Sequence, residues 1–256
     1  MTSDARSKRG RNGQNENRGP AGALQSKVIL ITGGSGGIGL AIARTCRQQG
    51  ARVVLAARDA RRLHRSAALL GGDAITVAAD LGQAAGVRRL MQTIARRCKR
   101  LDAVVHSAGI FTYKPFVRTT LRDWDLNLSS NLTSLFLVTQ GALPLLKRAA
   151  APQLVSILSV SSRRAFPKCA AYCASKFGAL GLTRVLAEEL RGEGIRVSAI
   201  LPGSTDTRMM NEFDFPVIRE ELMQPEDVAA AVLLALSAPL RSNIDEVLIT
   251  PSAGRV

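Results

Sequence analysis

The sequence predicts an α/β fold, a doubly wound parallel sheet of about seven strands with helices on both faces, built as a single domain. Three observations support this prediction. From residue 26 onward, short apolar runs alternate with stretches of helix length. The runs are apolar throughout, as expected of strands that are covered on both faces. Small and branched apolar residues are plentiful and aromatic residues are only 4% of the chain, which suits helices packed closely on a parallel sheet.

The expected elements follow one another in a regular order. The expected strands are residues 27–32, 51–57, 74–79, 101–109, 153–160, 195–203 and 244–250. The expected helices are residues 38–50, 59–70, 86–100, 121–150, 170–193 and 225–236. Strands that alternate with helices at this spacing form a parallel sheet through helical crossovers. Nothing in the composition divides residues 26–252 into two domains.

The N-terminal segment differs from the rest of the chain. Residues 1–25 contain almost no large apolar side chains and many Gly, Asn and Arg residues. Such a segment cannot bury enough apolar surface to offset the entropy of ordering it. We therefore expect a disordered basic tail over residues 1–25 and one folded domain over residues 26–256. An organelle-targeting helix is a less favoured alternative, because Gly and Pro interrupt the segment and acidic residues break its basic run.

The chain carries a formal net charge of +15 at pH 7, and its basic residues are densest in the predicted helices 59–70 and 86–100. Solvated helix faces are the simplest interpretation of this charge. Attraction of a phosphorylated or acidic ligand and non-specific contact with nucleic acid are the alternatives. Charge alone does not separate them, and a nucleic-acid partner is not expected.

Composition also limits location and metal binding. No apolar run reaches the ~18–20 residues that cross a bilayer, so no membrane association is expected. The cysteines have neither paired zinc-ligand spacing nor the pattern of a secreted disulfide framework. We therefore expect reduced thiols, no metal site and a cytoplasmic location. The cysteines are Cys46, Cys98, Cys169 and Cys173.

TGGSGGIG, residues 32–39, directly follows the first predicted strand and opens the first predicted helix. In that context Gly33 permits a sharp turn, Gly37 lets the backbone approach a diphosphate, and Gly39 lets the helix pack near the strand. The spacing T-G-x3-G-x-G matches the general G-x-G-x-x-G fingerprint only in part, and a glycine-rich turn without a ligand is the alternative. The candidate contacts in this loop are Gly33, Ser35, Gly37, Ile38 and Gly39.

The end of the second strand sets the choice between the two nicotinamide dinucleotides. An acid there would bind the ribose 2′-hydroxyl, but Ala57 stands at this position and Arg58 follows. Because Arg binds phosphate strongly, NADP(H) is favoured, and NAD(H) stays possible if Asp59 binds the ribose instead. Asp80, at the end of the third strand, is the candidate for the adenine amino group, with a helix N-cap as the alternative. Its neighbour Leu81 is included among the cofactor contacts.

Four residues form a candidate catalytic set. Tyr172 and Lys176 lie four residues apart on one helix face. There a neighbouring ammonium and a nearby positively charged nicotinamide would favour the phenolate and lower the ordinary tyrosine pKa of ~10. Ser159 ends the fifth strand, at the edge where open parallel sheets bind ligands, and can hydrogen-bond a substrate carbonyl. Asn131, in the middle helix, can extend a proton relay from the lysine. Taken singly, each has a structural alternative as a core aromatic, a solvated lysine, a strand end or a surface residue.

Together these motifs resemble the short-chain dehydrogenase/reductase family, of the single-domain type. The resemblance covers residues 26–252 and rests on TGGSGGIG, Asn131, Ser159 thirteen residues before Tyr172, and the YCASK motif that includes Lys176. It implies a Rossmann-like, dinucleotide-binding catalytic domain with an Asn–Ser–Tyr–Lys tetrad. It also implies hydride transfer between NAD(P) and an alcohol or ketone, with the lysine holding the nicotinamide ribose, and assembly as a homodimer or homotetramer.

Two further segments carry the resemblance. HSAG, residues 106–109, follows the fourth strand, and LPGSTDT, residues 201–207, is similar to the proline–glycine turn that borders the nicotinamide in the family. The resemblance implies that Thr207 binds the carboxamide. The cofactor contacts expected in these segments are Ser107, Ala108, Gly109, Pro202, Gly203, Thr205 and Thr207.

The chain departs from the family pattern at three places. Ser107 replaces an asparagine that ties strands together, and His106 before it is expected to be a satisfied structural residue. Many NADP-using relatives carry a basic residue inside the glycine loop, but Ser35 and Gly36 offer none. The chain end lacks the terminal glycine pair common in acyl-reductase relatives.

The predicted function is reduction of a small or medium carbonyl compound, or oxidation of the alcohol, with NADP(H) favoured. By family analogy, residues 209–223 form a small apolar lid over the substrate, or else pack into a miniature core of their own. The main alternative is a 3-oxoacyl-thioester reductase, whose acidic carrier protein would meet Arg163, Arg164 and Lys168. A dinucleotide-sensing regulator without turnover is the alternative from another class.

Overall fold

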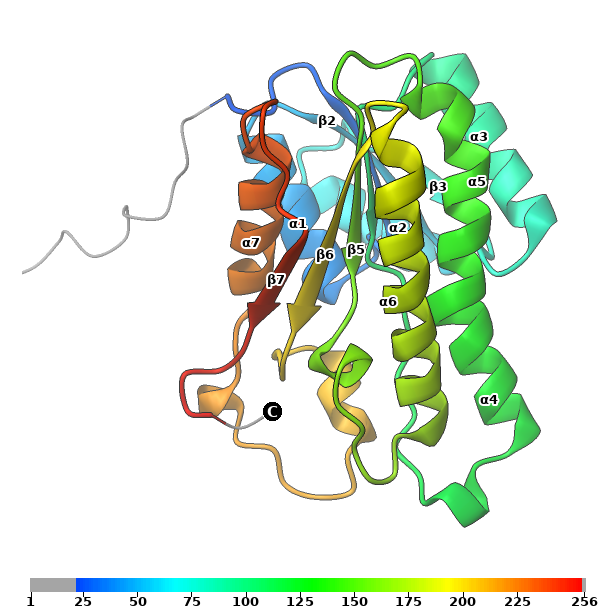
Figure 1. The fold of residues 1–256 in the computed structure, drawn as a ribbon, viewed down its shortest axis with the longest axis vertical. Helices are drawn as coiled ribbons and strands as arrows, with labels where there is room; N and C mark the ends of the chain where they lie inside the picture. Colours follow the sequence, from blue (N-terminus) through cyan, green and yellow to red (C-terminus); the bar gives the residue numbers. More distant parts are fainter. Residues whose placement is uncertain (1–21, 255–256) are drawn as a thin grey trace, which may run out of the picture.

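The computed structural model describes residues 22–254, in which seven parallel strands form one sheet in the order β3-β2-β1-β4-β5-β6-β7 (Figure 1). The predicted doubly wound fold is confirmed, and each expected strand is present with shorter bounds. The difference is largest for the strand expected over residues 101–109, which covers only Ala103–His106. The strands are β1 (Val28–Thr32), β2 (Arg52–Ala57), β3 (Ile75–Ala78), β4 (Ala103–His106), β5 (Gln153–Ile157), β6 (Arg196–Pro202) and β7 (Glu246–Ile249).

The helices connect the strands as expected, with one difference. The longer helices are α1 (Gly37–Gln48), α2 (Ala60–Leu69), α3 (Ala84–Arg97), α4 (Leu121–Leu128), α5 (Ser134–Leu146), α6 (Ala170–Arg191) and α7 (Pro225–Ser237). The helical region predicted over residues 121–150 is divided, because a π-helical turn, η2 (Ser129–Thr133), separates α4 from α5. Short 3₁₀ turns lie in the connections: η1 (Phe116–Arg118), η3 (Val160–Ser162), η4 (Arg208–Glu212) and η5 (Arg219–Glu221).

Two apolar layers cover the sheet. On one face, Ile42 of α1, Leu63 of α2 and Val232 of α7 pack in a single buried cluster with side chains of the central strands. On the other face, α3, α5 and the C-terminal part of α6 pack against the alternate side chains of the same strands. Fully buried strand residues such as Leu30 and Ile31 each contribute about 1.5–3 kcal/mol by leaving water. Because both faces of the sheet are packed, the positions of the strand ends, and of the side chains that follow them, are fixed.

The N-terminal boundary of the folded domain lies earlier than predicted. Residues 22–25, assigned to the tail, form a turn in which Leu24 is fully buried and its backbone N–H donates to the carbonyl oxygen of Gln49. The single large apolar side chain of this segment is enough to fasten it to the core beside α1. For residues 1–21, the predicted disordered tail lies outside the described residues.

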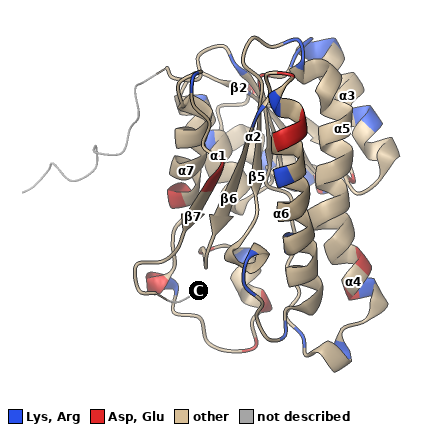
Figure 2. Cartoon of the chain, in the orientation of Figure 1, with Lys and Arg blue, Asp and Glu red and all other residues tan. Residues whose placement is uncertain are grey.

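The charge is distributed over many elements (Figure 2). Basic residues occur on α2, α3 and α6 and in the loops between them, which agrees with solvated faces as the main interpretation of the positive charge. Over residues 22–254, no helix is both long enough and apolar enough to cross a membrane. All four cysteines are free thiols, and Cys46, Cys169 and Cys173 are buried.

The parallel arrangement brings the strand ends together. Because every strand points the same way, the segments that follow β1, β4, β5 and β6 meet at one edge, toward which the arrowheads point in Figure 1. The chain leaves β1 toward β2 on one side, and the second half of the sheet begins at β4 on the other. In open α/β sheets, this reversal point at the carboxyl edge is where ligands bind.

Candidate active site

The glycine loop after β1 lies against the end of β4. Gly33 has a positive φ of 69°, and a methyl group there would come within 2.6 Å of the Ser107 carbonyl oxygen. A methyl group on Gly39 would come within 2.5 Å of the Gly33 carbonyl oxygen. Only glycine fits either position, so the chain makes a tight turn that brings α1 close to the sheet.

The N-terminus of α1 is open to an anion. Its N-cap residue is Gly36, no side chain caps it, and its first turn contains no acidic residue. The first backbone N–H groups of the helix have no intrahelical partner and carry the positive end of the helix dipole. Ser35 and Ile38 lie on the two sides of this cap. A backbone cradle that only glycines can form, over a free helix N-terminus, fits the diphosphate of a dinucleotide.

The segment after β2 contains two arginines and one acid. The Arg58 side chain is exposed, whereas Asp59 is the N-cap of α2 and accepts a 3.0 Å hydrogen bond from the backbone N–H of Arg62. That hydrogen bond lowers the pKa of Asp59, with further help from nearby guanidinium groups. Asp59 is thus engaged by the helix, which speaks against the alternative in which it binds a ribose hydroxyl.

Arg62 also lies in this region, although the sequence motifs do not predict a role for it. The guanidinium group of Arg62 lies over the glycine loop, so close that a methyl group on Gly36 would come within 2.8 Å of its Nη2 atom. No motif connects the two positions, which are 26 residues apart and on different elements. The only signal was the density of arginines in the predicted helix 59–70.

The end of β3 is a tight turn. Asp80 does not cap α3, because Gln83 is its N-cap residue; instead Asp80 Oδ1 accepts a 3.0 Å hydrogen bond from the Gly82 backbone N–H. The alternative interpretation of Asp80 as a helix N-cap is therefore wrong. Leu81 is buried in the core beside α3, so its side chain points away from a ligand at the edge and only its backbone can contact one.

The ends of β1 and β4 are tied together by a hydroxyl group. Thr32 Oγ1 accepts hydrogen bonds from the backbone N–H groups of Ser107, at 3.1 Å, and Ala108, at 3.0 Å. This bridge supplies the connection between strands that the missing asparagine put in question. His106 is buried with Nε2 3.0 Å from Thr139 Oγ1, and burial lowers its pKa to about 4. The prediction that His106 is a satisfied structural residue is confirmed.

Asn131 lies in the π-helical turn and is buried. Its Oδ1 accepts from the Ile110 backbone N–H at 2.8 Å, while its Nδ2 donates to the Ile110 carbonyl at 3.0 Å and to Ser175 Oγ at 2.9 Å. The single-residue alternative of a surface asparagine is wrong. Because both amide donors are engaged within the protein, Asn131 holds the chain after β4 against α6, and this is a positioning role.

Tyr172 and Lys176 lie on α6 beside the end of β5. The Lys176 Nζ atom is 5.8 Å from the centre of the Tyr172 ring and donates a 3.1 Å hydrogen bond to the Ile157 carbonyl. A methyl group on Gly109 would lie 3.0 Å from Asn131 Oδ1 and 3.8 Å from Lys176 Nζ, so three elements converge there. The structure thus places Asn131 and Lys176, which are far apart in the sequence, next to each other and close to Tyr172.

Burial dominates the electrostatics of this set. It raises the pKa of Tyr172 to about 12, although a hydrogen bond with the side chain of Ser159 acts in the opposite direction. Burial also lowers the pKa of Lys176 to about 8. The sequence predicts a lowered tyrosine pKa when the lysine and a bound nicotinamide are both near. In the protein alone, desolvation of the phenolate outweighs every attraction. At neutral pH Tyr172 is therefore a neutral proton donor.

The segment after β6 borders the glycine loop. Pro202 ends the strand, and the Gly203 backbone N–H donates to the Ile249 carbonyl at 2.8 Å. Thr205 is buried and its hydroxyl donates to the Gly203 carbonyl at 3.0 Å. Thr207 lies next to the glycine loop, where its methyl group would be 3.3 Å from a methyl on Gly37. A ligand on the loop would therefore be bordered by this segment.

Aromatic side chains from distant segments gather beside Tyr172. The Phe111 ring meets the Tyr172 ring edge to face at 4.8 Å and the Phe213 ring at 5.1 Å. Tyr113 and Phe215 extend this aromatic cluster. The ring centre of each lies 4.9 Å from that of Phe213, and the two ring centres are 5.9 Å apart. Two residues of the predicted lid, Phe213 and Phe215, thus pack together and also against the segment after β4.

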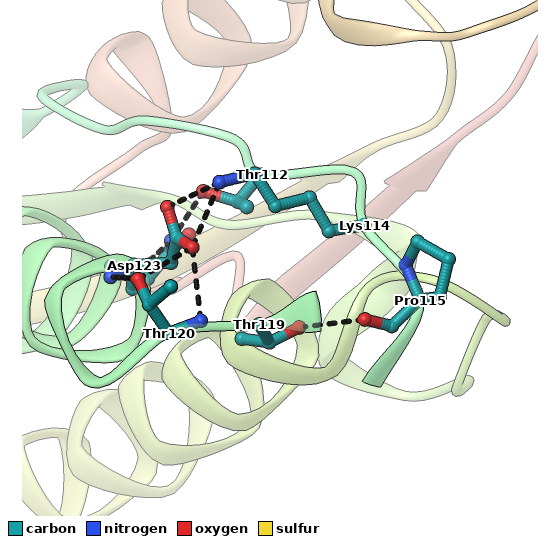
Figure 3. Close-up of polar contacts among 7 residues, drawn as sticks. Thr112, Lys114, Pro115, Thr119, Thr120 and Asp123 are labelled. Atoms are coloured by element: carbon teal, nitrogen blue, oxygen red, sulfur yellow. Dashed lines mark hydrogen bonds and ion pairs between the residues drawn. The ribbon is translucent and has the colours of Figure 1, made fainter. Parts of the chain in front are cut away.

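The segment that carries Phe111 and Tyr113 is fastened to the start of α4 (Figure 3). Lys114 Nζ contacts the Asp123 carboxylate at 2.8 Å, and this ion pair, with hydrogen bonds from Thr120, lowers the pKa of Asp123 to about 2. Thr120 and Asp123 also form a capping box, and Asn127 Nδ2 donates to Thr112 Oγ1 at 2.8 Å. The aromatic wall beside Tyr172 is therefore held in place from outside the site.

The chain is similar to known short-chain dehydrogenases over most of its length. A family profile described as "short chain dehydrogenase" matches residues 27–215. D-threitol dehydrogenase of Mycolicibacterium smegmatis is 34% identical over 239 residues, covering 88% of this chain and 92% of the relative.

Solved structures match over nearly the whole chain. A metagenomic short-chain oxidoreductase in complex with NADP is 32% identical, with a TM-score of 0.79 over 90% of this chain and 99% of that one. The 3-ketoacyl-(acyl-carrier-protein) reductase of Brucella melitensis, complexed with NADH, is 26% identical, with a TM-score of 0.82 over 90% of this chain and 98% of that one.

Proposed function

The chain belongs to the short-chain dehydrogenase/reductase family, whose members act on alcohol and carbonyl groups, and on that premise we propose that it reduces an apolar ketone or aldehyde with NADP(H). The arrangement of Ser159, Tyr172 and Lys176 at the carboxyl edge of the sheet is the observation that carries this proposal. The nicotinamide ring, when bound, supplies the hydride that adds to the carbonyl carbon.

The protein's own groups handle the oxygen and its proton. Ser159 donates a hydrogen bond to the carbonyl oxygen and orients it toward Tyr172. As negative charge develops on that oxygen, the Tyr172 hydroxyl transfers its proton to it, so that the alcohol is formed. The pKa of about 12 for Tyr172 keeps the phenol protonated before the reaction, which suits the reductive direction. Lys176 binds the nicotinamide ribose and stabilises the phenolate that remains, and Asn131 positions α6.

NADP(H) is the proposed cofactor. Arg58 is exposed at the end of β2 with an uncharged Ala57 before it, and Asp59 is occupied as a helix cap. The relative in complex with NADP supports this choice, whereas the carrier-protein reductase in complex with NADH shows that both cofactors occur among similar folds. The other proposed contacts are the glycine-loop residues, Asp80 with the adenine amino group, the backbone of Leu81, residues 107–109, Pro202, Gly203, Thr205 and Thr207.

The aromatic cluster indicates the class of substrate. Phe111 contacts the Tyr172 ring, and Phe213 and Tyr113 lie behind it, so the surface next to the proton donor is apolar. Such a wall favours a ketone with an alicyclic, alkyl or aryl substituent over a keto sugar, although the D-threitol dehydrogenase relative is named for a polyol. A panel of apolar ketones and keto sugars, compared by kcat/KM, tests this preference.

The 3-oxoacyl-thioester reductase is less well supported. Of the basic residues expected to meet an acidic carrier protein, Arg163 pairs with Glu246, and Lys168 contacts Asp214 at 2.7 Å. Their charges are already partly neutralised within the protein. The homodimer or homotetramer also stays a proposal, and it is supported by exposed apolar side chains such as Phe136 of α5 and Phe177 of α6.

Replacing Tyr172 tests the mechanism. Tyr172→Phe removes the proton donor while it keeps the ring in contact with Phe111, so kcat for ketone reduction should fall by about 100- to 10,000-fold. The dissociation constant of NADPH, measured by fluorescence titration, should stay within about threefold. Tyr113→Phe is the matched control, since Tyr113 is the only other tyrosine and lies in the same aromatic cluster. Retained turnover in Tyr172→Phe would contradict the proposed mechanism.

A further inference from the structure

Arg62 occupies space that a side chain of the glycine loop would otherwise fill. Gly36 is the residue before α1, and a methyl group on it would come within 2.8 Å of Arg62 Nη2. The guanidinium group of a helix α2 residue therefore lies directly on the loop that forms the proposed diphosphate cradle. Because Gly36 has no side chain, the arginine can approach the loop backbone this closely.

The position of Arg62 is fixed at the start of α2. Its backbone N–H is the group that Asp59 caps, at 3.0 Å, so the first turn of the helix is anchored next to the end of β2. Arg58 immediately precedes this cap and is exposed. Arg58 and Arg62 therefore lie on the two sides of one N-cap residue, four positions apart, at the edge of the sheet beside the glycine loop.

Both guanidinium groups are available for an external anion. Within residues 22–254, neither Arg58 nor Arg62 forms an ion pair with an acidic side chain. Asp59, the one acid between Ala57 and Arg65, is taken up by the helix N-terminus. The region thus combines two unpaired guanidinium groups with the free N-terminus of α1. Guanidinium groups bind phosphate through paired, charge-assisted hydrogen bonds.

We infer that Arg62 is the second arginine of the site for the 2′-phosphate of NADP(H), acting together with Arg58. This inference rests on the proposed function and adds the residue that sets cofactor choice. The resemblance to NADP-using relatives raised the absence of a basic residue in the glycine loop as a difficulty. In the structure, Arg62 of α2 supplies a positive charge at the glycine loop, because Gly36 has no side chain that would exclude its guanidinium group.

Binding of cofactor fragments to the free protein tests the inference without any turnover. The nucleotide 2′,5′-ADP contains the 2′-phosphate, whereas 5′-AMP lacks it, and both can be titrated by calorimetry. Arg62→Gln should weaken 2′,5′-ADP and NADPH by about 10- to 100-fold and leave 5′-AMP and NADH within about twofold. Arg58→Ala should act in the same direction. Arg62→Lys should recover part of the affinity, because a point charge replaces the planar fork.

A neighbouring arginine is the matched control. Arg61 lies on the same helix turn but lines a shallow depression with His64 and Arg65 on another side of α2. Arg61→Gln removes the same charge and should change 2′,5′-ADP affinity by less than about twofold. An equal loss in Arg61→Gln and Arg62→Gln would overturn the inference, since it would show only a general effect of positive charge.

The outcomes separate this inference from the proposed function. If the wild-type protein prefers NADPH and Arg62→Gln keeps that preference, the role of Arg62 is wrong and the proposed function stands. If the wild-type protein binds NADH and NADPH equally, the 2′-phosphate site is wrong but an oxidoreductase with either cofactor stands. If it binds neither dinucleotide, the proposed function fails together with the inference.

Discussion

The carboxyl edge of the sheet has two ends, one at the glycine loop and one at Tyr172. Their polar groups differ in how far they are exposed to water. At the glycine-loop end, the groups that face a ligand are backbone N–H groups and arginines such as the exposed Arg58. At the proposed catalytic end they are the side chains of Ser159, Tyr172 and Lys176, each less than 9% exposed. Burial shifts the pKa values of Tyr172 and Lys176 strongly. The Arg58 side chain, by contrast, is exposed to water.

This difference predicts which quantity each end controls. An exposed charge acts on the affinity for a charged ligand, and its effect is screened by salt. A buried group held by hydrogen bonds acts on the rate of reaction and on the stability of the fold, because its removal leaves partners unsatisfied. Substitutions at the glycine-loop end should therefore change Kd, and substitutions at the catalytic end should change kcat, pH dependence or stability.

The sharpest contrast is expected at Ser159. Ser159→Ala removes the hydroxyl proposed to polarise the substrate carbonyl, so kcat should fall by about 100- to 1,000-fold. The affinity for NADPH should stay unchanged, in contrast to Arg58→Ala, which should change affinity and leave kcat nearly intact. Steady-state kinetics and a binding titration on both variants check this. The neighbouring Ser161→Ala is the control, and a Ser159→Ala variant that lost affinity instead of rate would break the comparison.

His106 should make the protein sensitive to acid. Its pKa is about 4 in the fold, where it is buried, against 6.5 for the ordinary side chain. As the pH falls below 6.5, His106 becomes protonated in the unfolded chain but stays neutral in the folded one. The free energy of unfolding should therefore decrease by about 2 kcal/mol from pH 7 to pH 5. Urea unfolding at both pH values measures this loss.

A pair of histidine variants isolates the effect. His106→Gln should reduce the decrease in unfolding free energy between pH 7 and pH 5, even though it is destabilising at pH 7. His64→Gln, at an exposed position on α2, should leave the decrease unchanged. An equal acid sensitivity in wild type and His106→Gln would show that other groups cause it.

Lys176 should link cofactor affinity to pH. Burial lowers its pKa from 10.5 to about 8, so the ammonium proposed to bind the nicotinamide ribose is lost above pH 8. The affinity for NADPH should fall by up to about tenfold per pH unit above that value, and Lys176→Met should bind weakly with no such dependence. The stability of the fold should change in the opposite direction to the affinity. Lys176 keeps its proton up to about pH 10.5 in the unfolded chain but loses it near pH 8 in the folded one, so the free energy of unfolding should rise from pH 8 to pH 10.5.

The smallest effect is expected at the aromatic cluster. Phe213→Ala removes a ring that packs against Phe111 and Tyr113 at about 5 Å, worth about 0.5–1.5 kcal/mol beyond the buried area. The KM for an apolar ketone should rise by about three- to tenfold, with little change in kcat or in NADPH affinity. Phe215→Ala, which does not contact Phe111, should have a weaker effect. An unchanged KM for apolar ketones would remove Phe213 from the substrate site.

The strands, and the shared helix face of Tyr172 and Lys176, could be predicted because local patterns determine them. A continuous apolar run fixes a buried parallel strand, and the spacing of Tyr172 and Lys176 fixes a common helix face. Contacts between distant segments could not be predicted. Leu24 is one apolar residue in a polar tail, and nothing near it in the sequence shows that it packs beside α1. Phe111 and Phe213 meet only because two loops fold over the same strand ends.

In the protein alone, the pKa of Tyr172 lies above its ordinary value for a related reason. The sequence shows that Lys176 is near, but not that both groups lie out of contact with water. The desolvation of the phenolate depends on how completely Phe111, Cys173 and the surrounding helices cover the ring. Arg62 was missed because its contact with Gly36 depends on the path of α2 over the loop and on the absence of a side chain at position 36.

The π-helical turn between α4 and α5 makes the chain length of that region critical. Residues 129–133 are wound more widely than an α-helix, so one extra residue is accommodated just where Asn131 reaches Ile110 and Ser175. Deletion of a single residue from this turn would restore regular winding and rotate Asn131 by about 100° around the helix axis. A frame-preserving loss of one codon would thus break the contact of Asn131 with α6 while all four proposed catalytic side chains are retained. The spacing of this segment carries information that no residue-by-residue comparison of the tetrad would reveal.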